Sequence, residues 1–264
     1  MAGRIAVGIG GWNYEPWRGA FYPDGLSQKK ELAYAGSKLT SIEINATYYG
    51  SQKPESFAKW RAETPDEFLF SVKGSRFCTN RKDLALSAES VERFLNSGIT
   101  ELKEKLGAIN WQFMATKKFE SADFENFLRL LPPELKGLRL RHAVEVRHPS
   151  FQCTEFVDLV RRYGVAIITG ADDPDFPVIA DLTSDFAYVR IMGTQEAEAK
   201  GYSDGALDQW AYRARTLAEG QVPGDLATFG PKTEVKDHDV FLYVIGGHKV
   251  VNPLTAMALI ERVS

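Results

Sequence analysis

Strand-like and helix-like segments alternate along almost the whole chain. Short apolar runs lie at 5–10, 41–46, 68–73, 108–113, 143–147, 165–169, 186–192 and 240–245. Amphipathic segments of helical period separate most of them, at 29–37, 54–63, 87–105, 121–131, 154–163 and 204–219, and 252–263 follows the last. This alternation is typical of parallel βαβ units. It predicts one α/β domain over 1–264, a (β/α)8 TIM-like barrel with parallel strands and catalytic groups at the strand C-termini.

The segment boundaries predict where helices begin and where one fails. Asn252 before Pro253 predicts a helix that starts there with Asn252 as its N-cap, and Ser87 and Ser121 are similar. Aspartates and prolines crowd 170–182, where the sixth helix would stand, so we expect a loop or a degenerate helix. Long irregular connections, which are often functional, are expected at 193–205 and 221–239.

Composition narrows the function classes. The 32 basic and 35 acidic residues give a formal net charge of −3, which disfavours nonspecific binding along nucleic acid. Cys78 and Cys153 are too few for a disulfide framework, and we expect buried or incidental thiols in a reducing compartment. No apolar run approaches the roughly 18 residues of a membrane span. We therefore expect a cytoplasmic protein without a membrane partner.

Polar residues inside the strand-like runs share one parity. In 41–45, Ile42 and Ile44 point to one face of the strand while Glu43 and Asn45 point to the other. The polar set comprises Glu43, Asn45, Ser71, Lys73, Asn110, Gln112, Glu145, Arg147 and Arg190. Ionised groups are costly to bury unless they are paired and hydrogen-bonded, so charged residues from several strands on one face predict a pocket.

The chain also carries a combination of motifs that resembles one known family. These are Gly10 to Tyr14 with Trp17, Phe21-Tyr22-Pro23, Ile42 to Tyr49, Trp60 with Thr64-Pro65, Phe70 to Lys73, Gln112, Glu145 to His148 and Tyr188 to Arg190. Over nearly the whole chain they resemble domain-of-unknown-function family 72, the YecE-like proteins. The resemblance implies a TIM-like barrel with a site lined by these strand-end residues, and no securely established activity.

Two segments depart from the pattern of that family. Met192 stands where the family usually has His after the arginine of strand seven. The segment 245–248, Ile-Gly-Gly-His, replaces an aromatic-Asn-Asn motif at the end of strand eight.

Two interpretations of the charged residues remain open. In the first, a closed ion-pair network merely fills the barrel. In the second, Lys73, Arg147 and Arg190 hold an anion, because arginine offers a planar fork to carboxylate or phosphate. Glu145 and Glu43 are then the candidate acid and base, with Lys73 counted among the catalytic groups. Asn45 and Gln112 would orient the substrate. We expect these groups near the mouth, with Glu43 and Ser71 one layer deeper.

Further candidates lie at the rim. Trp12, Tyr14, Tyr48 and Tyr49 either form a stacking wall or cap the barrel core. Gly193, Gly246 and Gly247 follow strands seven and eight, where many barrels bind phosphate, although such glycines are more often turn residues. His148 is either a proton-transfer partner or a hydrogen-bonded rim residue. Asp172 is either a rim ligand for substrate or part of a solvated acidic loop.

We expect no metal and no cofactor. The four histidines, His142, His148, His238 and His248, do not have the distribution of the trinuclear zinc site of barrel endonucleases. A single Mg²⁺ on Asp172 or Glu145 is the remaining metal hypothesis.

The sequence thus predicts a barrel that acts without metal, as a hydrolase, lyase or isomerase, on a small anionic, phosphorylated or sugar-like ligand. Whether the protein is an enzyme at all stays open. The alternatives are a nucleic-acid-binding or nucleic-acid-processing barrel, which the charge does not favour, and a ligand-binding module without turnover. The oligomeric state is not indicated.

Overall fold

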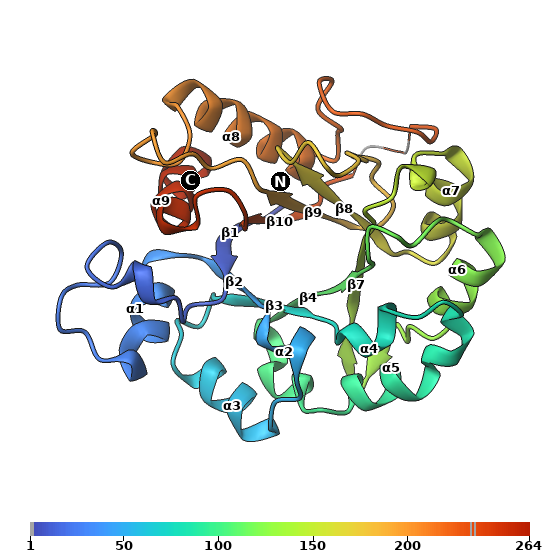
Figure 1. The fold of residues 1–264 in the computed structure, drawn as a ribbon, viewed down its shortest axis with the longest axis horizontal. Helices are drawn as coiled ribbons and strands as arrows, with labels where there is room; N and C mark the ends of the chain where they lie inside the picture. Colours follow the sequence, from blue (N-terminus) through green and yellow to red (C-terminus); the bar gives the residue numbers. More distant parts are fainter. Residues whose placement is uncertain (1–2, 233, 235) are drawn as a thin grey trace.

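Parallel strands close into a barrel at the centre of the molecule (Figure 1). The computed structural model describes residues 3–232, 234 and 236–264. Within them the strand order around the barrel is β1-β10-β9-β8-β7-β4-β3-β2, and every pairing is parallel. The strands are β1 Ile5–Gly10, β2 Ser41–Ile44, β3 Leu69–Lys73, β4 Leu106–Gln112, β7 Arg141–Glu145, β8 Ala166–Ala171, β9 Phe186–Ile191 and β10 Asp239–Val244. All eight coincide with predicted segments, so the predicted barrel is confirmed.

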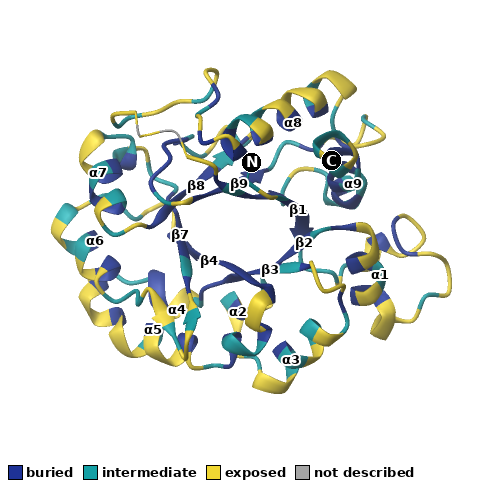
Figure 2. Ribbon diagram, turned by 180° about the vertical axis from the view of Figure 1, so that it is seen from behind, coloured by how far each residue is buried: buried dark blue, intermediate teal, exposed yellow. Residues whose placement is uncertain are grey.

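Helices form the outer layer around this barrel. They are α1 Glu31–Lys38, α2 Ala46–Tyr49, α3 Pro54–Ala62, α4 Arg76–Thr79, α5 Ala88–Leu95, α6 Ser121–Leu128, α7 Thr154–Arg162, α8 Asp204–Ala218 and α9 Asn252–Val263. Figure 2 shows exposed residues on the outside of these helices and buried residues in the barrel strands. A small hairpin, β5 Glu134–Leu135 with β6 Leu138–Arg139, lies outside the barrel sheet.

One predicted helix is divided. The amphipathic pattern at 87–105 predicts a single helix, but α5 ends at Leu95 and a separate 3₁₀ segment covers Ile99–Lys105. Gly98 stands between them with φ 110°, a left-handed conformation that a continuous helix cannot contain. The hydrophobic period continues across the break because both pieces pack on the same core.

The predicted caps are wrong although the helices begin where expected. Asn252 is the first residue of α9 and does not cap it, since a 3₁₀ turn at Lys249–Val251 precedes it. Its buried amide instead accepts a hydrogen bond from Thr194 Oγ1 at 2.8 Å. Ser121 and Ser87 make no side-chain cap either, and Ser87 Oγ donates to a carbonyl of α4.

The connection between β8 and β9 contains no helix among its described residues, in line with the sequence expectation. Threonine side chains fasten it to the strand instead. Thr183 accepts a hydrogen bond from Ile167 N–H and donates one to Val165 C=O. Thr169 Oγ1 donates to Ile179 C=O. Side-chain hydrogen bonds thus replace the packing that a sixth helix would supply.

The barrel interior changes from apolar to polar along its axis. One part is filled by a cluster that includes Ala6, Ala108, Ala143, Phe186 and Phe241. Strand register then places polar residues side by side at the C-terminal ends: Glu43 beside Ser71, Lys73 beside Asn110, and Gln112 beside Glu145. The inward parity predicted from the sequence is therefore what brings the site together.

No helix in the described part of the chain has both the length and the apolar composition needed to cross a bilayer.

Candidate functional site

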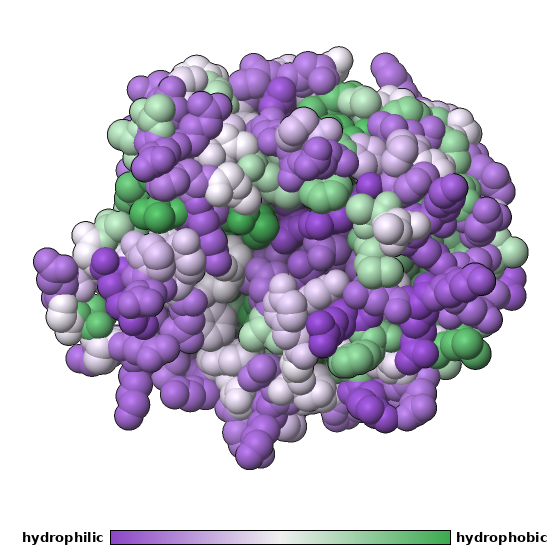
Figure 3. Space-filling view, viewed as in Figure 1, coloured by the Kyte–Doolittle hydropathy of each residue, from purple (hydrophilic) through white to green (hydrophobic). Residues whose placement is uncertain are grey.

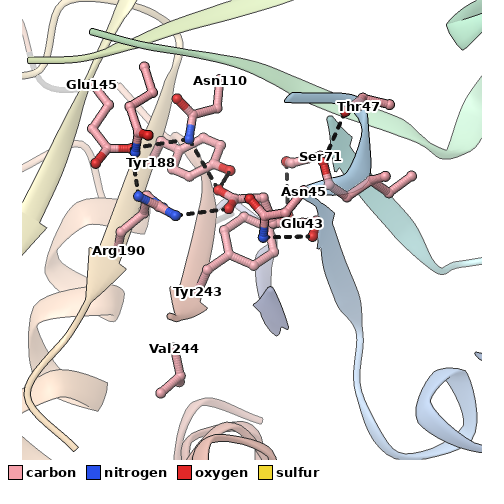
Figure 4. A network of polar contacts seen from close by, with 12 residues as sticks. Glu43, Asn45, Thr47, Ser71, Asn110, Glu145, Tyr188, Arg190, Tyr243 and Val244 are labelled. Atoms are coloured by element: carbon pink, nitrogen blue, oxygen red, sulfur yellow. Dashed lines mark hydrogen bonds and ion pairs between the residues drawn. The ribbon is translucent and has the colours of Figure 1, made fainter. Parts of the chain in front are cut away.

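The candidate site lies at the C-terminal ends of the barrel strands. Figure 3, drawn in the orientation of Figure 1, shows a recess with hydrophilic walls near the middle of the molecule. Figure 4 shows the side chains below it, which come from β2, β3, β4, β7, β9 and β10 and are joined by hydrogen bonds and ion pairs. We call this set the polar network.

Glu43 lies at the deep side of the polar network and is fully buried. Its Oε1 accepts from Arg190 Nη2 at 3.0 Å, while its Oε2 accepts from the Tyr188 hydroxyl at 2.5 Å and from Asn110 Nδ2 at 3.2 Å. Every one of these partners donates, so both oxygens of Glu43 are occupied as acceptors. The hydroxyl of Tyr188 remains protonated because burial and the Glu43 charge raise its pKa well above the ordinary value.

Glu145 is the second carboxylate and lies closer to the mouth. Its Oε1 accepts two hydrogen bonds from Arg147, at 2.6 and 2.8 Å, and its Oε2 accepts from Arg190 Nη1 at 2.6 Å. Gln112 and Asn110 donate to the same Oε2 at 2.8 and 3.3 Å. Burial alone would raise the pKa of Glu145, but the nearby cations outweigh it and lower the pKa to about 2. This carboxylate is ionised at neutral pH.

Arg190 joins the two carboxylates across the barrel. Its two terminal nitrogens bind Glu43 and Glu145, and its side chain is only 2% exposed. From the sequence we expect this guanidinium near the mouth as part of an anion clamp. The structure instead places it at the depth of the carboxylates, because both of its forked ends are anchored there.

Lys73 ends β3 and differs from the other charged groups. Its ammonium lies 4.7 Å from the centre of the Tyr48 ring, and no described side chain or carbonyl forms a hydrogen bond or ion pair with it. Burial, assisted by the nearby Arg190 charge, lowers the pKa of Lys73 from 10.5 to about 8. The carboxylates of the network act in the opposite direction and only partly offset this effect.

Two amides and one arginine complete the mouth. Asn45 follows β2 and fits beside Gly10, where a Cβ would lie 2.7 Å from Asn45 Nδ2. Its Nδ2 donates weakly to Glu43 C=O at 3.4 Å, and its buried Oδ1 has no partner among the described residues. Gln112 is oriented by Glu145, as described above. Arg147 is about one-quarter exposed and packs on the face of Phe176 at 4.3 Å.

The four aromatic candidates do not form one wall. Trp12 packs edge-on against Trp60 at 5.1 Å and belongs to the core between barrel and helices. Tyr14 contacts Trp17. Tyr48 is the residue whose ring lies against the ammonium of Lys73. Tyr49 contacts Tyr48 and is 68% exposed. Tyr48 is thus the aromatic residue that the structure brings to the charged groups.

The rim glycines owe their positions to close contacts between loops. A Cβ on Gly247, which has φ 64°, would lie 2.3 Å from Thr194 C=O, and a Cβ on Gly246 would lie 2.8 Å from Met192 Cβ. A Cβ on Gly193 would lie 2.6 Å from Asp172 Cβ. Close contacts with Thr194, Met192 and Asp172 therefore explain why glycine stands at these three positions.

Asp172 and His148 are both engaged by protein groups. Asp172 Oδ2 accepts hydrogen bonds from the Tyr202 hydroxyl and from Trp210 Nε1, each at 2.8 Å. His148 Nδ1 accepts from Ser150 N–H at 3.1 Å and caps a short 3₁₀ turn. Both residues hold loops at the rim in place, outside the polar network.

The donor atoms available for a cation are few. In 3–232, 234 and 236–264, no group of three His, Cys, Asp or Glu side chains converges as a ligand set. Both oxygens of Glu145 already accept hydrogen bonds from cationic or amide donors. His142 is held between Trp111 Nε1 and Pro132 C=O, and burial lowers its pKa to about 4.

Sequence reasoning missed the tyrosines of the polar network. Tyr188 binds Glu43, and Tyr243 binds the hydroxyls of Ser41 and Ser71 at 2.6 and 2.8 Å. Inside apolar strands they resemble core aromatics. Their parity was an available signal, since Tyr188 precedes Arg190 by two residues and therefore shares its face.

Comparisons with known proteins agree with this architecture. Residues 6–264 match the family model described as "Protein of unknown function DUF72". The UPF0759 protein YecE of Escherichia coli K12 is 29% identical over 148 residues, which are 56% of this chain and 50% of that protein. The chain spans about half the length of the curated relatives that it matches.

Two solved structures share the fold over almost the whole chain. A DUF72 family protein from Thermotoga maritima has a TM-score of 0.72 at 24% identity, covering 98% of this chain and 99% of that one. Another from Enterococcus faecalis has a TM-score of 0.69 at 17% identity, covering 98% and 97%. The barrel, the motifs and the near-complete family match lead to one conclusion: the chain belongs to the DUF72 family.

Proposed function

We propose that the barrel mouth binds a small anion and that the protein is a metal-independent enzyme, a lyase, isomerase or hydrolase, in which Lys73 is the reactive group. One observation carries the proposal. Among the described residues, Lys73, Arg147 and Arg190 lie near two carboxylates, and Lys73 is the one of these three cations that has no ion pair. The excess positive charge in a buried setting favours an incoming anion.

The two carboxylates serve this proposal as a scaffold. Glu145 has a pKa of about 2 and cannot donate a proton near neutral pH. Glu43 is occupied by three donors and lies beneath the other groups. We therefore assign them the task of fixing Arg147 and Arg190 in place, and we move the acid–base role from the glutamates to Lys73. A pKa of about 8 suits proton transfer near physiological pH.

The polar atoms around Lys73 suit a ligand that carries oxygen functions beside its anionic group. Arg147 presents its outer edge to the mouth, since Nε and one Nη bind Glu145. Asn45 Oδ1 and Asn110 Oδ1 are buried acceptors without a partner among the described residues. They would receive hydroxyl or amide hydrogens of the ligand. Small hydroxy acids, oxo acids and sugar phosphates meet these requirements.

The test is a binding screen on three proteins: the wild type, Lys73→Met and Lys118→Met. Lys118 is an exposed lysine and serves as the matched control. Small carboxylates, inorganic phosphate and sugar phosphates are screened by thermal shift and titration calorimetry, and mixtures are followed by NMR for turnover. Loss of one charged hydrogen bond corresponds to about 1.5–3 kcal/mol, so Lys73→Met should weaken binding roughly 10-fold or more.

The same screen separates the alternatives. Binding that is equal in all three proteins would refute the site assignment. Tight binding that depends on Lys73 without turnover of any bound compound would identify a ligand-binding module. Gel shifts with single-stranded and abasic DNA at low salt test the nucleic-acid alternative, because phosphate contacts are strongest there.

A further inference from the structure

Two lysines are buried in the described part of the chain, and their surroundings differ. Lys105 is 4% exposed, and its ammonium donates to Arg61 C=O at 2.7 Å and to Thr64 C=O at 2.8 Å. Lys73 is 8% exposed, and its ammonium lies 4.7 Å from the centre of the Tyr48 ring. A buried ammonium normally needs acceptors, because desolvating it without them is costly. Lys105 meets that need with protein acceptors, whereas Lys73 has no hydrogen-bond acceptor among the described residues.

The carboxylates near Lys73, Glu43 and Glu145, already accept hydrogen bonds from other donors. The register partner of Lys73 on β4 is Asn110, whose Nδ2 binds both Glu43 and Glu145. Figure 4 shows the oxygen of Asn110 turned away from those carboxylates. Arg190 holds the same two carboxylates from the opposite side. The network therefore leaves the nitrogen of Lys73 as an amine without a hydrogen-bonded counter-ion.

Such an amine is suited to covalent chemistry. An amine with an available lone pair attacks carbonyl carbons, and burial beside another cation is a recognised way to make a lysine nucleophilic. Arg190 and Arg147 are the neighbouring cations here, and both act to lower the pKa of Lys73. The Tyr48 ring shields the amine from one side without offering it a proton acceptor.

We propose that Lys73 forms an imine with the carbonyl group of a small anionic substrate, an oxo acid or a keto- or aldose phosphate. The inference rests on the proposed function, since it requires the anion site. The neutral Nζ attacks the carbonyl carbon, a C–N bond forms and the C=O electron pair moves to oxygen. One proton passes from nitrogen to oxygen, and a second comes from solvent. The C–O bond then breaks, water leaves, and a protonated imine remains without any redox change.

The protonated imine explains why acid–base carboxylates are unnecessary at the reacting atom. It withdraws electrons from the adjacent carbon, so a C–H or C–C bond there can break. Arg147 would hold the anionic group of the same substrate. Of the three reaction classes proposed above, this step selects the lyases and isomerases.

The experiment uses the full chain and traps the imine with cyanoborohydride. Glyoxylate, pyruvate and dihydroxyacetone phosphate are the anionic probes, and acetone is the neutral control. Peptide mass spectrometry then locates the reduced adduct. At pH 8 an amine of pKa about 8 is about half neutral, compared with roughly 0.4% for an ordinary lysine, so Lys73 should be labelled about 100-fold faster than Lys118.

The outcomes distinguish this inference from the proposed function. Support is an adduct on Lys73 that depends on the anionic group of the probe, disappears in Lys73→Met and persists in Lys118→Met. If the anionic probes bind in a Lys73-dependent way but no adduct forms on Lys73, the imine is refuted and the anion site stands. If adducts follow surface exposure and no probe binds, both are refuted. Circular dichroism of each variant confirms that it is folded.

Discussion

Replacing Glu145 by glutamine tests how much the buried charge of Glu145 contributes to the free energy of unfolding. The substitution keeps the shape of the side chain and removes its charge, so Arg147 and Arg190 lose a shared carboxylate. Removing one partner of a buried ion pair costs about 3–5 kcal/mol. The pKa gives an independent figure: a decrease from 4.5 to about 2 corresponds to about 3 kcal/mol. We expect Glu145→Gln to lower the free energy of unfolding by about 3 kcal/mol at pH 7.

The pH dependence has a defined sign. The folded pKa of Glu145 lies below its unfolded value, so its contribution is complete above about pH 5 and is lost as the pH falls towards 2. The difference in stability between wild type and Glu145→Gln should therefore shrink from about 3 kcal/mol at pH 6 to about 1.4 kcal/mol at pH 3. Contributions from carboxylates outside the polar network cancel in this difference.

Urea unfolding followed by circular dichroism measures both quantities. Glu89→Gln is the control, because Glu89 and Arg93 form an ion pair in which both side chains are more than 70% exposed. Exposed pairs contribute little, and we expect a change below about 0.5 kcal/mol. A loss under about 1 kcal/mol in Glu145→Gln, or a difference that stays constant between pH 6 and pH 3, would refute the reasoning.

Three further predictions use the same unfolding assay. Lys73→Met should stabilise the protein by up to about 3 kcal/mol at pH 7, because folding disfavours the charged form of a lysine whose pKa is lowered. This gain in stability should disappear as the pH rises from 8 to 10.5. Tyr188→Phe removes the 2.5 Å hydrogen bond to Glu43 and should cost about 1.5–3 kcal/mol. Gly74→Ala places a methyl 2.4 Å from the buried Trp111 ring and should cost about 1–3 kcal/mol.

Each of these has a matched control. Lys118→Met alters an exposed lysine and should leave the free energy of unfolding unchanged both at pH 7 and at pH 10.5. Tyr243→Phe removes hydrogen bonds to neutral hydroxyls only and should cost less than Tyr188→Phe. Gly50→Ala adds a methyl with no atom within 4 Å and should be nearly neutral. Equal effects in a variant and its control would contradict the corresponding explanation.

Strand periodicity explains why so much of the candidate site was predictable. Side chains alternate across a strand, so parity alone places Glu43, Lys73 and Gln112 on the inner face once the barrel is predicted. Parallel register then brings the strand C-termini to the same end. Neither step requires knowledge of a ligand.

Pairing was not predictable in the same way. Lys73 ends β3 and Lys105 ends the 3₁₀ segment before β4, yet among the described residues the first lacks acceptors and the second has three. The depth of Arg190 depends on two carboxylates from β2 and β7, which are 147 and 45 residues away along the chain. Which donor reaches which acceptor depends on the three-dimensional structure, and the periodicity of the sequence does not indicate it.

Loop geometry also limited what could be predicted from the sequence. After β1 the backbone turns through Gly11 at φ 72°, and Trp12 packs against Trp60 instead of facing the mouth. Gly246 and Gly247 resemble a phosphate-binding turn in sequence, but the approach of Thr194 explains Gly247. A glycine in a sequence indicates that another group lies close to its Cα, but it does not indicate whether that group belongs to a ligand or to the protein itself.

The cost of burying the polar network supports the proposed ligand site at the mouth. A buried ion-pair network can often be replaced by hydrophobic residues with no loss of stability, so stability alone does not require it. In this barrel the two carboxylates bind Arg190 and Arg147 with every oxygen occupied, and no described residue pairs with the amine of Lys73. A network that only filled the barrel would gain by placing an acceptor on that amine. Its absence is the arrangement expected of a preorganised site, in which the protein leaves one interaction for its ligand to complete.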